Sequence, residues 1–245
     1  PSERHGHGAG DTSAEGREES GYNYRRLFSL FWKMVLCSGT RGLRLVSLLG
    51  VGEDAVVVDA RANQLSPQFD RNSSLWTATK QGADGIQVTS LTGSTTVSPS
   101  WLKGLQLRDF AISPEGDRLV LLAGGEAGYT SYVVAIKRNP KGVVTALGAP
   151  ISLPWHTGNP VSISWGTATQ VLVLYRDYGS VSTTPVSYLI GGDSRELGRV
   201  ADGARIVGSN TGAVFVVSTD GMLLEYLGYS WSTILSQVQA AKFAG

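Results

Sequence analysis

Cysteine, net charge and long apolar runs are all scarce in this chain of 245 residues. Cys37 is the only cysteine, which makes an internal disulfide impossible and argues against a cysteine-based zinc site. The 21 basic and 20 acidic side chains leave a net charge of +1, too weak a field to hold a polyanion, so we expect no nucleic-acid partner. No apolar run reaches the roughly 18 residues of a membrane-spanning helix. The 42% hydrophobic content is nevertheless typical of a globular protein.

The N-terminal segment differs in composition from the rest. Residues 1–26 show no apolar periodicity, and their Gly, Ser, Glu, Arg and His content predicts a disordered tail. The apolar residues of 27–37 follow helical spacing, which predicts a short apolar helix or a non-native leader. A lipid-attachment cysteine normally follows a small residue, whereas Leu36 precedes Cys37, so we assign no lipid anchor here. The first residue is Pro1, which suggests a processed product or a fragment.

From Leu43 onward the chain consists of short apolar runs rich in β-branched residues and separated by turn residues, which predicts strands and almost no helix. Pro114–Asp117 and Asp220-Gly221 have the composition of tight hairpin turns. The predicted strands are Leu43–Leu49, Ala55–Ala60, Leu75–Thr79, Ile86–Leu91, Leu105–Ile112, Arg118–Ala123, Tyr132–Lys137, Val161–Trp165, Gln170–Tyr175, Pro185–Ile190, Arg205–Gly208, Ala213–Ser218 and Met222–Leu227.

These strands repeat with a regular spacing. Short motifs that begin at Gln68, Ser113, Ser164 and Ser209 are separated by 45, 51 and 45 residues, and each precedes a polar turn and a strongly apolar strand. A period of about 40–50 residues with four short strands per unit is typical of a β-propeller blade. A single blade cannot cover both of its faces, so blades must stack around an axis.

We therefore predict an all-β chain. Residues 1–42 are expected to form a disordered tail and a short apolar helix, and residues 43–245 a partial β-propeller domain of about four and a half blades of four antiparallel strands each. The strands at Leu43–Leu49 and Ala55–Ala60 would be the outer part of an incomplete blade. We expect the chain to be the C-terminal part of a larger propeller.

An ordered set of motifs carries a family resemblance. Leu65–Thr77 (LSPQFDRNSSLWT), Leu107–Val120 (LRDFAISPEGDRLV), Val161–Trp165, Val171–Val173 and Val217–Tyr226 followed by Trp231 together resemble the C-terminal β-propeller of LpqB, a lipoprotein of actinobacteria. The similarity covers approximately residues 43–235. Each motif alone is common among propellers, so the order of the set makes the resemblance specific.

The resemblance implies a protein without enzymatic activity on the extracytoplasmic face of the cell membrane. Members of the LpqB family are held there by a lipid anchor and influence the sensor histidine kinase of the MtrA/MtrB two-component system, which the resemblance makes the expected partner. This chain lacks the family's domain between the lipidated cysteine and the propeller, and residues 1–42 match nothing in it. Attachment of this chain to the membrane by a lipid is therefore not assigned.

Catalytic and cofactor motifs are weak in this sequence. Residues 50–55 match a dinucleotide fingerprint, but a strand pattern follows them where a phosphate cradle needs a helix, so we predict a hairpin turn and no cofactor. His156 lies between blades without a nucleophile elbow, which favours a role in the surface or a turn. Three carboxylates, Asp70, Asp109 and Asp177, flank strands that could approach a central channel. Clustered there, they would favour a propeller hydrolase with an axial carboxylate site.

Tryptophans provide the candidate binding residues. Trp76 and Trp165 lie in or beside predicted strands and are expected in the core, whereas Trp101 and Trp155 lie in loops near prolines. Loop aromatics on a rigid ring favour contact with a partner protein, so Trp101 and Trp155 are the candidate partner-contact residues. We expect no catalytic residue and no metal site. A TolB-like periplasmic scaffold propeller remains an alternative, because its Ser-Pro-x-Gly repeats are similar to Ala111–Gly116.

Overall fold

The computed structural model describes residues 61, 63–90 and 93–238 with their side chains, and the backbone of three strands at 34–39, 42–47 and 56–59. The predicted tail at residues 1–26 lies outside the described residues. In the described part, two 3₁₀ helices, η1 (Gly82–Asp84) and η2 (Ser100–Leu102), are the only helical segments. No helix in these ranges is long and apolar enough to cross a membrane.

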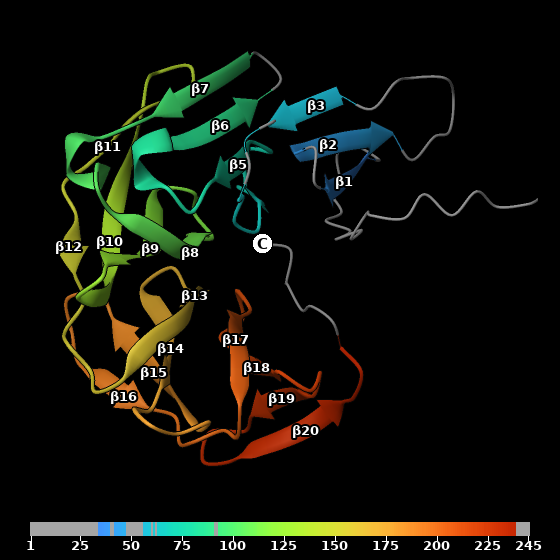
Figure 1. Cartoon of the computed structure of the whole chain (residues 1–245), viewed down its shortest axis with the longest axis vertical. Coiled ribbons are helices and arrows are strands. Elements are labelled where there is room, and N and C mark those ends of the chain that lie inside the picture. The colour runs from blue at the N-terminus through green and yellow to red at the C-terminus, as the bar shows by residue number, and fades with distance from the viewer. Residues whose placement is uncertain are drawn as a thin grey trace, which may run out of the picture.

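The described strands form five antiparallel sheets arranged around a common centre, as predicted for a propeller (Figure 1). Each of the four complete blades follows chain order from its inner to its outer strand, with β8, β13 and β17 nearest the centre. The three-stranded sheet consists of β1 (Met34–Gly39), β2 (Gly42–Ser47) and β3 (Val56–Asp59). The first blade consists of β4 (Gln68–Phe69), β5 (Leu75–Ala78), β6 (Ile86–Ser90) and β7 (Gly93–Val97), and the second of β8 (Gln106–Ile112), β9 (Arg118–Gly125), β10 (Gly128–Arg138) and β11 (Val144–Leu147), with β12 (Ile151–Ser152) also paired to β10. The third blade consists of β13 (Asn159–Thr167), β14 (Gln170–Arg176), β15 (Thr183–Leu189) and β16 (Ser194–Glu196), and the fourth of β17 (Gly203–Gly208), β18 (Val214–Ser218), β19 (Leu223–Tyr226) and β20 (Trp231–Leu235).

The N-terminal boundary of the sheet region differs from the prediction. The predicted helix over residues 27–37 is wrong where the structure describes it, because 34–37 belong to strand β1. Strand β1 pairs with β2 in a continuous antiparallel register from Met34 opposite Ser47 to Gly39 opposite Gly42. Backbone pairing with a neighbouring strand overrides the helical spacing of a short apolar run. Residues 27–33 lie outside the described part of the chain.

The second strand of each complete blade carries the buried apolar sequence. In β9, Leu119 and Leu121 pack into the core shared with the first blade, whereas Val120 and Leu122 pack into the core shared with the third blade. Strands β14 and β18 alternate between two cores in the same way. Burial of one such aliphatic side chain contributes about 1.5–3 kcal/mol. The continuous apolar runs in the sequence therefore follow from sheets that are covered on both faces.

Neighbouring inner strands are joined by hydrogen bonds between side chains and backbone, which we call inner-strand ties. The side-chain amide of Gln68 in β4 donates to the carbonyl of Phe110 in β8, and its oxygen accepts from the backbone N–H of Ile112 at 3.2 Å. In the next pair of blades, the carboxylate of Asp109 in β8 accepts from the N–H of Ile163 in β13 at 3.1 Å. The inner strands of different blades belong to separate sheets, so these side chains satisfy backbone groups that no ladder pairs.

Hydroxyl groups make the inner-strand ties between the third and fourth blades. The Oγ atom of Ser162 accepts from the N–H of Ile206 at 3.3 Å, and the Oγ atom of Ser164 accepts from the N–H of Gly208 at 3.2 Å. The two strands approach so closely here that a Cβ atom at Gly208 would lie 2.1 Å from the carbonyl oxygen of Trp165. Glycine is required at this position by the neighbouring backbone.

We predict that Gly208→Ala lowers the free energy of unfolding by about 1–3 kcal/mol, because the added methyl group forces β17 away from β13. Gly125→Ala is the matched control, since a Cβ atom there meets nothing within 4 Å. The control should be neutral or stabilising by up to about 1 kcal/mol. Urea denaturation of both variants measures the difference, and equal stabilities would contradict this account of the interface.

Candidate functional site

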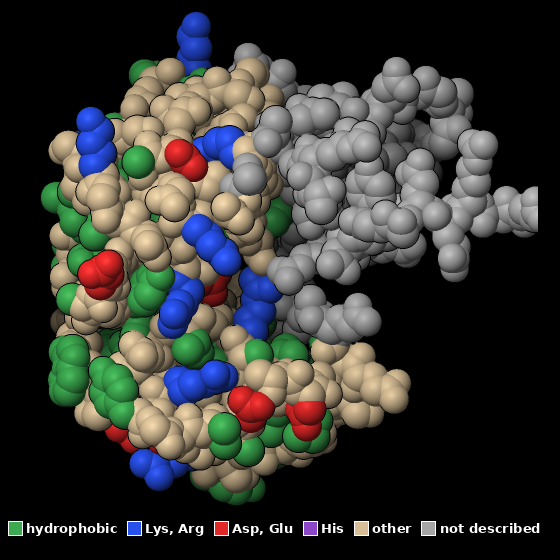
Figure 2. Space-filling model, in the orientation of Figure 1, with side chains coloured by type: hydrophobic (Ala, Val, Ile, Leu, Met, Phe, Trp, Pro, Cys, Tyr) green, Lys and Arg blue, Asp and Glu red, His purple; other side chains and the backbone are tan. Residues whose placement is uncertain are grey.

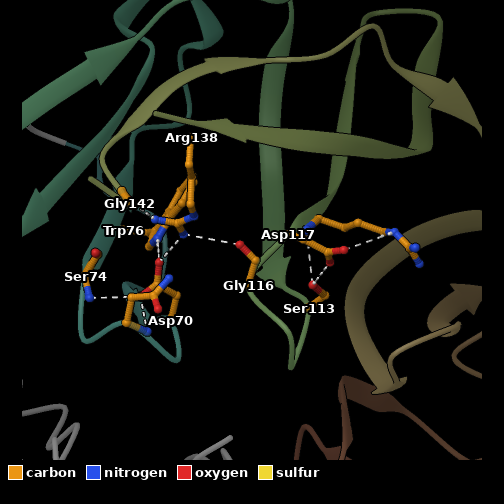
Figure 3. Close-up of polar contacts among 10 residues, drawn as sticks. Asp70, Ser74, Trp76, Ser113, Gly116, Asp117, Arg138 and Gly142 are labelled. Atoms are coloured by element: carbon orange, nitrogen blue, oxygen red, sulfur yellow. Dashed lines mark hydrogen bonds and ion pairs between the residues drawn. The ribbon is translucent and has the colours of Figure 1, made fainter. Parts of the chain in front are cut away.

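Asp70 is the most densely bonded of the three aspartates that the sequence singled out (Figure 3). Its fully buried carboxylate follows β4 and accepts hydrogen bonds from the N–H groups of Asn72 and Ser74, both at 2.9 Å. The indole Nε1 of Trp76 donates to the same carboxylate at 2.9 Å. The side chain therefore shapes the turn between β4 and β5 and fixes a core tryptophan.

Arg138 connects this turn to the next blade. Its Nη2 atom, at the end of β10, lies 2.6 Å from Oδ2 of Asp70 and also donates to the carbonyl of Gly116 at 3.2 Å. Its Nη1 atom donates to the carbonyl of Gly142 at 2.9 Å. The ion pair is nearly enclosed, because the Arg138 side chain is only 16% exposed. Asp70 thus joins the first and second blades and is saturated with donors.

The other two aspartates also have structural partners. Asp109 accepts from the hydroxyl of Ser162 at 2.9 Å, in addition to its inner-strand tie. Asp177 follows β14, accepts from the hydroxyl of Thr184 at 3.1 Å and lies 3.3 Å from Nε of Arg199. The Asp109–Ser162 hydrogen bond joins two blades, and the Asp177–Thr184 hydrogen bond closes the hairpin between β14 and β15.

The three aspartates do not form an axial cluster. Asp70 lines one axial cavity, Asp109 lines another, and Asp177 lines neither of these two. Within the residues that carry described side chains, no three His, Cys, Asp or Glu residues are grouped to hold a metal ion. A hydrolase needs a carboxylate free to meet substrate, and the hydrogen bonds of these three groups serve the fold. The geometry gives the hydrolase alternative no support.

Trp101 lies in η2 and packs on the body of the ring. Its ring is partly buried against the core between the first and second blades, and its Nε1 atom donates to the carbonyl of Gly148 at 3.1 Å. The hydrogen bond and the packing both account for an aromatic residue at this position.

Trp155, in contrast to the partly buried Trp101, is exposed to solvent. Its side chain belongs to the loop before β13 and is 81% exposed. The loop between β14 and β15 leaves the same end of the blade, since Asn159 pairs with Arg176, and it carries Tyr178 and Val181, which are 66% and 68% exposed. We call Trp155, Tyr178 and Val181 the rim patch. Figure 2 shows hydrophobic side chains at the lower left edge, over the third blade.

His156 fastens the loop that carries Trp155. Its Nε2 atom lies 3.0 Å from Oε1 of Glu196 in β16, and its Nδ1 atom lies 2.8 Å from the carbonyl oxygen of Thr157. The imidazole ring also packs on Tyr175, with 4.6 Å between ring centroids. This position agrees with the surface or turn role predicted for His156. The exposed indole of Trp155 therefore projects from an anchored loop.

A buried pair of tyrosines lies next to His156 in the loop that carries Trp155. The hydroxyl groups of Tyr175 and Tyr188 lie 2.9 Å apart on neighbouring strands of the third blade. Burial raises the pKa of Tyr188 well above its usual range, and the adjacent Tyr175 hydroxyl adds to the shift. Burial also raises the pKa of Tyr175. Both hydroxyls are neutral at physiological pH, so the tyrosine ring on which His156 packs carries no charge.

Sequence reasoning did not group Tyr178 and Val181 with Trp155. They lie 23 and 26 positions further along the chain, and an apolar residue in a loop gives no sign of its neighbours. The signal that could have found them is the antiparallel pairing of β13 with β14, which brings their flanking loops to one end of the blade.

A comparison with protein families decides the affiliation of the chain. The family described as the lipoprotein LpqB β-propeller domain matches residues 34–242. The chain belongs to this family. The match begins at the first residue of β1, so LpqB-type sequence includes the three-stranded sheet as well as the four complete blades. A search of curated proteins gave no match.

Solved structures support the propeller fold of this LpqB-type domain. A chain of a nidogen–laminin complex has a TM-score of 0.58 at 11% identity, with 83% of this chain and 76% of that chain covered. A gluconolactonase from Xanthomonas campestris has a TM-score of 0.59 at 16% identity, with coverages of 86% and 75%. A virginiamycin B lyase from Staphylococcus aureus has a TM-score of 0.53 at 11% identity, with coverages of 84% and 67%. At these identities the similarity concerns the fold alone.

We predict that Arg138→Met destabilises the protein by about 3–5 kcal/mol, because it leaves the buried carboxylate of Asp70 without its counter-charge. The double variant Asp70→Asn/Arg138→Met should recover part of this loss. Thermal and urea unfolding provide the measurement.

Arg199→Met is the matched control for this experiment. It removes the same charge from an ion pair whose arginine is 76% exposed, so its cost should stay below about 1 kcal/mol. A loss in Arg138→Met no larger than in the control would show that Asp70 does not depend on its partner.

Proposed function

We propose that this domain is a binding module without enzymatic activity, which acts on the extracytoplasmic face of the cell membrane as part of an LpqB-type lipoprotein. Its partner in this proposal is the extracytoplasmic part of the sensor histidine kinase of the MtrA/MtrB two-component system, whose signalling it modulates. Family membership supports the lipoprotein context. The kinase as partner comes from the resemblance to LpqB alone, and the rim patch offers a surface on which a protein could bind.

The observation that carries the proposal is the exposure of Trp155. Its indole is 81% exposed, and tryptophan is among the residues that contribute most to protein–protein binding. Tyr178 and Val181 are exposed apolar residues in the other loop at the same end of the blade. A few apolar anchors of this kind suit a protein partner better than a small polar substrate.

Anchoring of the loop supports the same conclusion. His156 is held by Glu196 and Tyr175, so less conformational freedom is lost when Trp155 is buried by a partner. The stacked blades in turn hold this loop on a rigid support. Binding with little rearrangement is therefore the expected mode.

The three aspartates give no support to a catalytic alternative. Each of Asp70, Asp109 and Asp177 accepts hydrogen bonds from residues of the fold, and two of them join neighbouring blades. Enzymes occur among the structural neighbours, but their likeness to this chain is confined to the fold.

We predict that Trp155→Ala weakens binding to the purified extracytoplasmic domain of the sensor kinase by about 30-fold, which corresponds to a hot-spot loss of about 2 kcal/mol. Thermal stability should be unchanged, because the side chain contacts mainly water. Biolayer interferometry measures the affinity.

Tyr229→Ala is the matched control, since Tyr229 is an aromatic residue that is 87% exposed and lies on the fourth blade outside the rim patch. Its affinity for the kinase domain should equal that of the unchanged protein. Equal affinities for all three proteins would rule out the rim patch as the contact surface, and no binding by the unchanged protein would remove the kinase as partner.

A further inference from the structure

Two cavities lie along the inner strands of the ring, and we call them together the axial passage. One cavity of about 420 Å³ is lined by residues 64–67, 108–109, 161–162 and 204–205, all at the beginning of the inner strands. A second cavity of about 110 Å³ is lined by residues further along the same strands, including 68–71, 111–114, 163–165 and 205–208. Arg205 lines both cavities.

The smaller cavity is rich in hydrogen-bond donors that the protein does not use. Arg71, Arg205 and Asn210 all line it, and their side chains carry two guanidinium groups and one amide. None of these three groups has a hydrogen bond or ion pair within the described part of the chain. Arg205 is partly buried, whereas Arg71 and Asn210 are exposed to solvent. Each guanidinium offers five hydrogen-bond donors to a ligand.

Two carboxylates line the cavities, and both have hydrogen-bond partners within the fold. Asp70 is fully buried and paired with Arg138, which belongs to neither cavity lining. Asp109 at the wider cavity accepts hydrogen bonds from Ser162 and Ile163. The neighbouring Arg108 donates to the carbonyl of Pro160 and lies over the ring of Tyr129.

The arrangement of charge agrees with the surface view. Figure 2 shows Lys and Arg side chains gathered around the middle of the viewed face, where the blades converge. The chain as a whole carries a net charge of only +1, so this concentration of basic groups is local. A local positive site within walls of low dielectric attracts small anions more strongly than the same charges spread over a surface.

We propose that the axial passage is a binding site for a small organic anion, with a carboxylate or phosphate group held between Arg71 and Arg205. The planar guanidinium groups match the oxygen geometry of both anions, and the Asn210 amide supplies a further donor. The wider cavity beyond Arg205 has room for the rest of the ligand.

Isothermal titration calorimetry of the full chain tests this proposal with two probes, inorganic phosphate and citrate. The amine buffer contains no phosphate and no carboxylate ions. The unchanged protein should bind at least one probe with a Kd of about 1 mM or tighter. Arg205→Gln should weaken that binding at least about tenfold, and Arg71→Gln should weaken it in the same direction, because each removes a charged donor. Preference for phosphate assigns a phosphorylated ligand, and preference for citrate a carboxylate ligand.

Arg199→Gln is the control of equal charge, since Arg199 is exposed and lines neither cavity. It should change the affinity less than about twofold. Circular dichroism establishes that the variants fold, and Arg205→Lys, which keeps the charge, should bind more tightly than Arg205→Gln. The proposal is overturned if the unchanged protein binds neither probe, or if Arg71→Gln, Arg205→Gln and the control Arg199→Gln lose affinity equally.

Discussion

Each blade of this domain depends on its neighbours, because its second strand is apolar on both faces. Strands β9 and β14 place alternate side chains into two different cores, so removal of one neighbouring blade would expose a full row of aliphatic groups. The inner-strand ties fix how the stacked sheets are aligned with one another. Gln68, Asp109 and Ser162 each bond backbone groups of the adjacent blade, which sets the height of one sheet relative to the next. Apolar stacking supplies most of the stability, and the ties specify the alignment.

The need to join neighbouring blades also explains the positions of two of the aspartates. A propeller axis is a place where carboxylates can meet, and the sequence placed three aspartates beside strands that approach it. Asp70 instead joins two blades through its ion pair with Arg138, and Asp109 joins two blades by accepting from the backbone N–H of Ile163. Among the described residues that line the two cavities, Arg71 and Arg205 are positively charged and have no partner in the described part of the chain. Exposed apolar groups are placed elsewhere, in loops such as the one that carries Trp155.

The sequence was most informative where burial is complete. The second strands of the blades and the turns at Gly116 and Gly221, both with positive φ, were predicted because apolar runs and turn residues have strong local signatures. Outer strands such as β7, β16 and β20 were missed. Ser194–Glu196 of β16 is wholly exposed and polar, so its strand conformation comes from pairing with β15 and leaves no apolar pattern. Strand β1 was taken for a helix for the related reason that pairing with β2 is a nonlocal contact. The rim patch was found only at Trp155, since the neighbours of a loop depend on strand register.

Hydrogen exchange across β9 and β14, followed by mass spectrometry at increasing denaturant, tests the mutual dependence of the blades most directly. Both strands are covered on their two faces by neighbouring blades. If each blade is stable only against its neighbours, the amides of β9 and β14 exchange through one shared opening, with the free energy of global unfolding. Separate openings of the second and third blades, with clearly different free energies, would contradict the account.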